Sequence, residues 1–198
     1  MMPEQASLHG FAPPRSSDRL FLAVRPDGAA TARIAALARR LREEHGVPGR
    51  PLDDARLHVT LQFFGGFAGL PQSLITAIER VVDGIELRGF EVVFDHVASF
   101  DGGGRRRPWV LRGSEDGLAR LHALYAALGR GLAAAGVRVE GHARYVPHLT
   151  LLYGDRALPR QAIEPIAWTV RELVLVDSLV GQGVHRALQH WPLWADRP

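Results

Sequence analysis

LHVTLQFFG at residues 57–65 and PHLTLLYG at residues 147–154 are two versions of one pattern, 90 residues apart. Each has histidine, any residue, threonine and leucine, followed by an aromatic residue and a glycine. Both are rich in apolar and β-branched residues, which predicts two strands. A pattern that occurs twice at this distance predicts a chain built from two similar α/β lobes.

The pattern also fixes where its polar side chains point. Residues i and i+2 of a strand project from the same face, so His58 and Thr60 share one face and His148 and Thr150 share another. The leucines and the other apolar residues point the opposite way, into a core. If the two strands lie near each other, two imidazoles and two hydroxyls meet in one groove.

Two imidazoles facing each other favour acid–base chemistry. The ordinary pKa of histidine is near 6.5, so one ring can accept a proton while the other donates one. The hydroxyls of Thr60 and Thr150 can donate hydrogen bonds to an anion held between the rings. The set suits cleavage of a phosphoester without a metal ion. A lone strand histidine is more often structural and a lone threonine is an ordinary strand residue; it is the repeat that favours function.

The rest of the sequence predicts an α+β fold. Apolar spacing and the positions of glycine and proline predict helices at 31–44, from Pro71 onward and at 115–135. The predicted strands lie at 19–24, 57–64, 90–100, 109–111, 146–153, 168–176 and 184–191. Strands that follow one another without a helix between them indicate a mixed, largely antiparallel sheet with outer helices and a central groove. Residues 1–17 are expected to be a mobile extension, and residues 18–198 a single bilobal domain.

The composition excludes several classes of protein. The 198 residues include no cysteine, which excludes disulfides, thiolate catalysis and iron–sulfur ligation. All 24 basic residues are arginine and the formal net charge is only +3, so only local basic patches would attract nucleic acid. No apolar run is long enough to cross a membrane and none resembles a secretory signal, so a cytoplasmic location is expected. The protein is also expected to be a monomer.

The two motifs resemble those of the two-histidine (2H) phosphoesterases, and the likeness spans roughly residues 19–194. Other matching features point to one branch of that superfamily, the RNA 2′,3′-cyclic phosphodiesterases, also called 2′-5′ RNA ligases. These features are the opening RLFLAVRPD at residues 19–27, the basic run before Trp109, and the WPL at residues 191–193.

The resemblance implies a bilobal fold with both histidines in a central groove and no cofactor. It implies hydrolysis of an RNA-terminal 2′,3′-cyclic phosphate to a 2′-phosphate. By position in the family's motifs, His58 would be the proton donor and His148 the proton acceptor, while Thr60 and Thr150 would hold phosphate oxygens. The expected partner is RNA with a cyclic phosphate end, or a small cyclic nucleotide.

The sequence departs from the family at Tyr153, where members often carry an arginine that meets the phosphate. Tyrosine can donate a hydrogen bond but brings no charge. Either another arginine supplies the charge, with Arg144 as the candidate, or anion binding is weaker and the preferred substrate differs.

Further candidate substrate-binding residues are less specific. Arg105, Arg106 and Arg107 follow a glycine-rich stretch and could grip an RNA backbone, or could simply form a solvated hairpin loop. Phe21 could stack a base in the groove or belong to the core.

Other functions fit the same residues. The same chemistry could run as 2′-5′ RNA ligation by the reverse reaction, or could hydrolyse a small cyclic phosphate such as ADP-ribose cyclic phosphate. A non-catalytic RNA-binding module is the alternative from another class. No metal site is expected, because no histidine has acidic or histidine partners at ligand spacing.

Overall fold

The computed structural model describes residues 16–100, 106–141 and 144–194, so the predicted extension at residues 1–17 lies almost wholly outside it. The helices are α1 (Gly28–His45), α2 (Gln72–Asp83) and α3 (Ala119–Ala134). The strands are β1 (Asp18–Val24), β2 (Val59–Phe67), β3 (Phe90–Ser99), β4 (Arg107–Arg112), β5 (Leu149–Gly154), β6 (Gln161–Val170), β7 (Glu172–Leu179) and β8 (Val184–Pro192). Short 3₁₀ turns lie at Asp54–Arg56 and Asp116–Leu118.

Within the described residues, the eight strands form one sheet in the order β6-β3-β4-β5-β2-β1-β7-β8, and all of their pairings are antiparallel. The two motif strands, β2 and β5, are the central neighbours, joined by the single pair Val59 and Leu149. Each then pairs outward with a strand that precedes it in the chain, β1 or β4. The units β1–α1–β2 and β4–α3–β5 are therefore equivalent, and the prediction of an α+β fold of two similar halves is confirmed.

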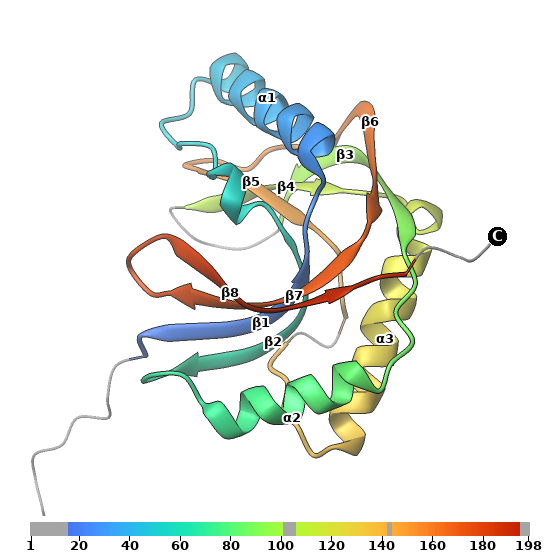
Figure 1. Ribbon diagram of the computed structural model, residues 1–198. Coiled ribbons are helices and arrows are strands. Elements are labelled where there is room, and N and C mark those ends of the chain that lie inside the picture. The colour runs from blue at the N-terminus through green and yellow to red at the C-terminus, as the bar shows by residue number, and fades with distance from the viewer. Residues whose placement is uncertain (1–15, 101–105, 142–143, 195–198) are drawn as a thin grey trace, which may run out of the picture.

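The two halves are also joined by their helices. Helix α1 packs against β5 and β6 of the other half, whereas α3 packs against β2 and β3, and α2 packs on α3 (Figure 1). Figure 1 shows α1 at one end of the molecule and α2 and α3 together at the other end, with the sheet between them. Each half thus supplies a helix that buries apolar surface of the opposite half.

The apolar residues divide between two faces of the sheet. One large cluster holds the inward faces of the helices and alternate strand residues, including Leu20, Leu22 and Val59. A small second cluster on the other face of β1 and β7 contains Phe21, Ala23, Val174 and Val176. The second cluster is the face toward which Thr60 points, because Thr60 pairs with Ala23.

Local residues cap helix α1 at both ends. The Asp27 carboxylate accepts a hydrogen bond from the backbone N–H of Ala30 at 2.8 Å, which caps the first turn. Gly46 adopts a left-handed conformation at φ 59° and its N–H bonds back into the last turn, as glycine does with little strain. The chain then turns toward the first motif.

Three sequence predictions need correction. The strand predicted at 168–176 is two strands, because residues up to Val170 belong to β6 and pair with β3, whereas β7 begins at Glu172 and pairs with β1. Strands β2 and β5 begin one residue after His58 and His148, so the histidines lie just before the strands rather than within them. The helix predicted at 115–135 begins at Ala119, after a 3₁₀ turn.

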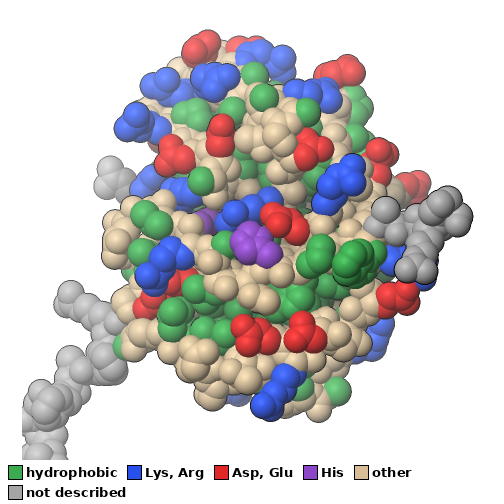
Figure 2. All heavy atoms as spheres, viewed as in Figure 1, with side chains coloured by type: hydrophobic (Ala, Val, Ile, Leu, Met, Phe, Trp, Pro, Cys, Tyr) green, Lys and Arg blue, Asp and Glu red, His purple; other side chains and the backbone are tan. Residues whose placement is uncertain are grey.

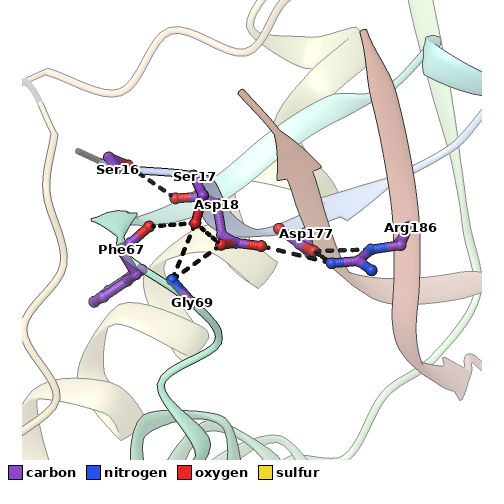
Figure 3. A network of polar contacts seen from close by, with 7 residues as sticks. All are labelled: Ser16, Ser17, Asp18, Phe67, Gly69, Asp177 and Arg186. Atoms are coloured by element: carbon purple, nitrogen blue, oxygen red, sulfur yellow. Dashed lines mark hydrogen bonds and ion pairs between the residues drawn. The ribbon is translucent and has the colours of Figure 1, made fainter. Parts of the chain in front are cut away.

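An ion-pair network ties the first described strand to the last hairpin (Figure 3). Arg186 on β8 donates to the Asp177 carboxylate at 2.6 and 3.0 Å and lies 3.5 Å from that of Asp18. Asp177 is fully buried and Asp18 nearly so. The Ser17 hydroxyl and the Gly69 N–H also donate to Asp18. Arg186 is the cation that compensates two buried carboxylates.

No helix in the described part of the chain is long and apolar enough to cross a membrane.

Candidate active site

His58 and His148 lie at the ends of the two central strands, on the same side of the sheet. In an antiparallel pair, the residues on either side of the Val59–Leu149 pair face each other across the two strands. This register sets His58 opposite Thr150 and Thr60 opposite His148, so all four side chains leave the same face. The two halves therefore bring both motifs together in space.

The two imidazoles are held in the same way. His58 Nδ1 is 2.6 Å from the carbonyl oxygen of Arg56, and His148 Nδ1 is 2.9 Å from that of Val146. In each case the carbonyl belongs to the residue two positions earlier. A carbonyl can only accept, so each Nδ1 carries the proton and each Nε2 is left to exchange protons with a ligand.

Aromatic rings enclose His58. Its ring stacks on Phe21 at 4.9 Å and meets the edge of His185 at 5.1 Å. Burial lowers the pKa of His58 from 6.5 to about 4, aided by the charges of His148, Arg25 and Arg56 and opposed by the hydrogen bond to the Arg56 carbonyl. His58 is therefore neutral at pH 7 in the unliganded protein.

His148 has a similar but separate environment. Its ring meets the ring of Phe100 edge to face at 4.7 Å, and the Arg112 guanidinium lies over the same Phe100 ring at 5.8 Å. Burial lowers the pKa of His148, and the positive charge of Arg112 lowers it further, against the effect of the Val146 carbonyl. Both motif histidines thus combine a fixed ring with a depressed pKa, a combination typical of functional sites.

Matching β-bulges follow the two threonines. Thr60 pairs with Ala23 and Gln62 with Leu22, so Leu61 is the extra residue of β2. On β5, Thr150 pairs with Val110 and Leu152 with Trp109, so Leu151 is the extra residue. Within the described residues neither threonine hydroxyl has a hydrogen-bond partner, which leaves both able to bind a ligand.

Tyr145 connects the two motifs. Its hydroxyl donates to the carbonyl of Thr60 at 3.0 Å, and its ring stacks on Tyr125 of α3 at 3.8 Å. The Tyr125 carbonyl in turn accepts a hydrogen bond from the buried amide of Gln62 at 2.9 Å. Tyr145 lies three residues before His148, so these contacts fix the approach to the second motif against the first.

The other predicted substrate-binding residues take different positions. Tyr153 is 39% exposed, and the Arg106 guanidinium lies 5.5 Å from its ring centre. Arg144 instead lies 4.0 Å from Glu115, with an exposed side chain. Arg107 lies on β4 opposite Gly154. Arg105 falls outside the described residues. Phe21 is only 6% exposed and its face covers His58.

Sequence reasoning missed several residues that the fold brings to the site. His185, on β8, contacts both Phe21 and His58, and burial lowers its pKa to about 4. Phe100 and the Arg56 carbonyl hold the two motif rings. None of these belongs to a repeated pattern, and only the pairing of distant strands places them, so no local signal could have found them.

No group of three or more histidine and acidic side chains in the described ranges is arranged to hold a metal ion. A cavity of about 1100 Å³ lies next to the site, between the segment after α1 and the ends of β4 and β5. Arg56, whose carbonyl holds His58, lines this cavity together with Tyr153, although neither motif histidine does.

Several solved structures resemble the chain. A phosphoesterase aligns with a TM-score of 0.67 and 25% identity, over 90% of this chain and 99% of its own. LigT of E. coli in complex with 3'-AMP aligns with a TM-score of 0.64 and 25% identity, over 90% and 99%. TT0787 of Thermus thermophilus shares the fold, with a TM-score of 0.66 and 23% identity over 90% and 100%. No curated protein matches significantly.

A family model described as the 2'-5' RNA ligase superfamily matches residues 31–182. The match takes in both histidine motifs, nearly all of α1 and every strand from β2 to β7. It therefore covers both motif strands and all of the two repeated units except β1 and the first turn of α1. The chain belongs to the 2'-5' RNA ligase superfamily, whose members are 2H phosphoesterases.

Proposed function

We propose that this protein hydrolyses the 2′,3′-cyclic phosphate at the end of an RNA to a 2′-phosphate, without a metal ion. Membership of the superfamily supports a phosphoesterase or ligase enzyme in general. The observation that carries the proposal is the matched pair of imidazoles, each with Nδ1 bonded to a backbone carbonyl and Nε2 left for a ligand.

His148 is proposed as the general base. Its Nε2 takes a proton from a water molecule as the water oxygen attacks phosphorus. The depressed pKa of His148 keeps this nitrogen unprotonated at neutral pH, as a base requires. The Val146 carbonyl holds the ring in the tautomer that leaves Nε2 free.

His58 is proposed as the general acid. Its Nε2–H gives a proton to the 3′ oxygen as the bond from phosphorus to that oxygen breaks, leaving a 3′-hydroxyl and a 2′-phosphate. A ring with a pKa of about 4 must gain a proton before it can donate one. The bound phosphodiester anion favours the charged imidazolium and raises this pKa. The acid would therefore form when substrate is present.

Thr60 and Thr150 are proposed to bind the non-bridging phosphoryl oxygens. Each hydroxyl lies on the same face as the two histidines and lacks a partner within the described chain. Hydrogen bonds of this kind stabilise the charge that develops on phosphorus as water adds. Solved structures of E. coli LigT hold 3'-AMP, ATP, phosphate or NADP+, which supports a nucleotide phosphate as the ligand of this site.

The test is a short RNA ending in a 2′,3′-cyclic phosphate, incubated with the protein and EDTA, with the product terminus mapped. We expect a 2′-phosphate, no effect of EDTA, and a loss of at least about 100-fold in kcat for His58→Ala or His148→Ala. Circular dichroism and thermal unfolding check that both variants fold.

Other outcomes identify the alternatives. An active His58→Ala/His148→Ala double variant would overturn the mechanism. A 3′-phosphate product would keep the acid–base pair but reverse which oxygen leaves. Joining of a 5′-hydroxyl RNA to the cyclic phosphate, in place of hydrolysis, would indicate a ligase. Turnover of a small cyclic phosphate but of no RNA would move the substrate to that class.

A further inference from the structure

The cavity next to the active site, called here the Tyr153 cavity, has features of a second binding site. It measures about 1100 Å³ and is lined by Arg50, Leu52, Arg56, Arg106, Tyr153 and Asp155, among others. This volume slightly exceeds the roughly 300–1,000 Å³ usual for small-ligand pockets, so it can accept a group as large as a nucleotide.

The positive charge of the cavity is only partly offset from within, because three arginines line it against two carboxylates, Asp53 and Asp155. Arg50, Arg56 and Arg106 form no ion pair with any described residue, and the Nε atom of Arg56 is buried without a hydrogen-bond partner. Of the two carboxylates on the lining, Asp155 is paired with Arg156 at 3.1 Å. Unpaired arginines around a concave surface favour a ligand that carries phosphate.

Tyr153 adds a surface for a flat ring. It is one of few large apolar or aromatic side chains that are exposed in the described part of the chain, at 39%. One side of its ring is approached by the Arg106 guanidinium at 5.5 Å. An exposed aromatic ring beside a guanidinium can stack a nucleobase while the cation meets the backbone phosphate.

The wall of the cavity is firmly attached to the motif strand. Pro51 forms a bridge to Leu152 of β5, and the Leu52 N–H donates to the carbonyl of Leu151 at 2.8 Å. A Cβ atom at Gly49 would collide with the Tyr153 carbonyl, so this close approach needs glycine. Figure 1 shows this segment after α1 beside the ends of β4 and β5.

The cavity and the proposed active site share a border. Tyr153 lies three residues after Thr150 on the same strand, and Arg56 gives its carbonyl to His58. A terminal 2′,3′-cyclic phosphate occupies the 3′ end of an RNA, so the rest of the RNA leaves the site only in the 5′ direction. A cavity bordering both motifs is in a position to receive it.

We propose that the Tyr153 cavity binds the nucleotide that precedes the terminal one, which carries the cyclic phosphate. The base of this preceding nucleotide stacks on Tyr153, and its phosphate is held by Arg106 and Arg50. This inference rests on the proposed function, which supplies the terminal phosphate. It names the substrate class as an oligonucleotide end rather than a cyclic mononucleotide. The arginine beside Tyr153 is Arg106, not Arg144, which lies near Glu115.

A second cavity adjoins the first and offers a path for a longer RNA. It measures about 670 Å³, shares the segment from Arg50 to Asp53 with the first, and is also lined by Arg39 and Arg42 of α1. On the face seen in Figure 2, arginine side chains are frequent over α1, interspersed with acidic ones. Nucleotides further in the 5′ direction would therefore pass over α1.

The experiment compares kcat/KM for adenosine 2′,3′-cyclic phosphate with that for a tetranucleotide ending in the same group. We expect the tetranucleotide to be preferred at least about fivefold, the lower end of what one base stacked on an aromatic ring contributes. Tyr153→Ala should remove that preference, lowering kcat/KM for the tetranucleotide at least about fivefold more than for the mononucleotide. Tyr153→Phe, which retains the ring, should keep it.

Charge is tested by salt dependence. Arg106→Gln and Arg50→Gln should each reduce the slope of log affinity against log salt for the tetranucleotide by about 0.7, the value for one phosphate contact on a single strand. Arg130→Gln is the matched control, because Arg130 is exposed on α3 and lines neither cavity. It should leave both the slope and the substrate preference unchanged.

A binding measurement separates this inference from the proposed function. Fluorescence anisotropy with a labelled tetranucleotide ending in a 2′-phosphate requires no turnover. Weaker binding to Tyr153→Ala and Arg106→Gln supports the cavity even if no cyclic phosphate is hydrolysed. Equal binding to the wild type and these two variants, or an equal loss of kcat/KM on both substrates, would overturn it.

Discussion

At the scale of single residues, the site depends on two half-buried imidazoles that share a tautomer. The Nδ1–H of each is committed to a backbone carbonyl, so only Nε2 exchanges protons with a ligand. Burial has lowered the pKa of both rings. Burial removes the water that would stabilise a protonated ring, so the bound phosphate must provide that stabilisation instead. The protonation state of the site therefore depends on whether an anion is bound.

That coupling predicts how activity depends on pH. The active form needs one neutral and one protonated imidazole, and its population is greatest between the two pKa values. The pKa of His58 is about 4 in the free protein, and the pKa of His148 lies below 6.5. The plot of kcat/KM against pH should therefore be bell-shaped, with its maximum below pH 6.5. The phosphodiester anion raises both values in the complex, so the bell for kcat should move to higher pH. Initial rates at saturating and at low substrate measure both profiles. A kcat/KM maximum above about pH 7 would contradict the assignment.

His185 offers a direct test of why the pKa of His58 is low. Desolvation is the largest cause of the shift, and the edge of the His185 ring, 5.1 Å away, supplies part of the cover. His185→Ala should let water reach His58, and because water stabilises the protonated ring, the pKa of His58 should rise toward 6.5. His185→Phe, which keeps a ring there, should leave the pKa of His58 near its value of about 4. NMR titration of the His58 ring protons measures both. An unchanged pKa in His185→Ala would mean that other residues exclude the water.

The residues of the site fall into two groups: those marked by a local sequence pattern and those placed only by contacts between distant strands. His58, Thr60, His148 and Thr150 could be predicted because the same short pattern occurs twice. Covering residues such as His185 could not, because they act through contacts between strands distant in sequence. Arg144 was the candidate that the sequence offered beside Tyr153, yet Arg106 lies over that ring, since β4 pairs with β5.

At the scale of elements, the repeat extends from sequence to backbone geometry. Strands β2 and β5 each carry a bulge at the leucine that follows the threonine, Leu61 or Leu151. A bulge increases local twist and turns the next side chains to new faces. Gln62 consequently enters the core, where its amide donates to the carbonyl of Tyr125. Sequence alternation alone would have placed Gln62 on the open face with Thr60.

The contacts of Tyr145 with the Thr60 carbonyl and the Tyr125 ring yield a prediction about the elements around the site. Tyr145→Phe keeps the ring stacked on Tyr125 but removes the hydrogen bond to the Thr60 carbonyl. We expect the free energy of unfolding to fall by about 1 kcal/mol, the usual net value of such a bond, and kcat to fall more than KM changes, because both motifs lose a fixed position. Urea unfolding and steady-state kinetics measure the two effects.

Tyr125→Phe is the matched control for that variant. It makes the same chemical change one ring away, and the Tyr125 hydroxyl has no hydrogen-bond partner within the described residues. Its stability and kcat should stay close to those of the wild type. If the two variants behave alike, the hydroxyl of Tyr145 has no special part in holding the motifs together.

Elements were predictable where their apolar pattern was strong. Helix α1 and strands β1 and β3 were located to within a few residues, because Ile34, Leu37 and Leu41 follow helical spacing and the strands are rich in apolar residues. Strand β6 was mostly missed. It lies at the edge of the sheet, contains Pro165 and exposes about half of its residues, so its pattern is weak. No glycine or proline marks the break between β6 and β7 at Arg171.

At the scale of the whole molecule, two equivalent halves meet at a narrow junction. The pairing between β2 and β5 is a single residue pair, whereas the outer pairings run over four or more. The junction is reinforced by α1 and α3, each of which packs against a strand of the other half. Residues of one continuous core reach both halves. The separation of the two motifs is therefore set by helix packing as much as by strand pairing.

The ends of the described chain are held by charge as well as by strand pairing, which gives a prediction for the whole fold. Arg186→Met would leave the Asp177 carboxylate, which is fully buried, without its counter-ion, and Asp18 would lose the same partner. Removing one member of a buried ion pair typically costs about 3–5 kcal/mol, and since the Arg186 side chain is half exposed, we expect about 3 kcal/mol by urea unfolding.

Asp177→Asn combined with Arg186→Met should recover part of the loss, because a neutral amide needs no counter-ion. Arg160→Met, at an exposed position, should change stability by no more than about 0.5 kcal/mol. If Arg186→Met matched that control, β1 and the last hairpin would be held by their strand pairing alone, and the network in Figure 3 would contribute nothing measurable to the fold.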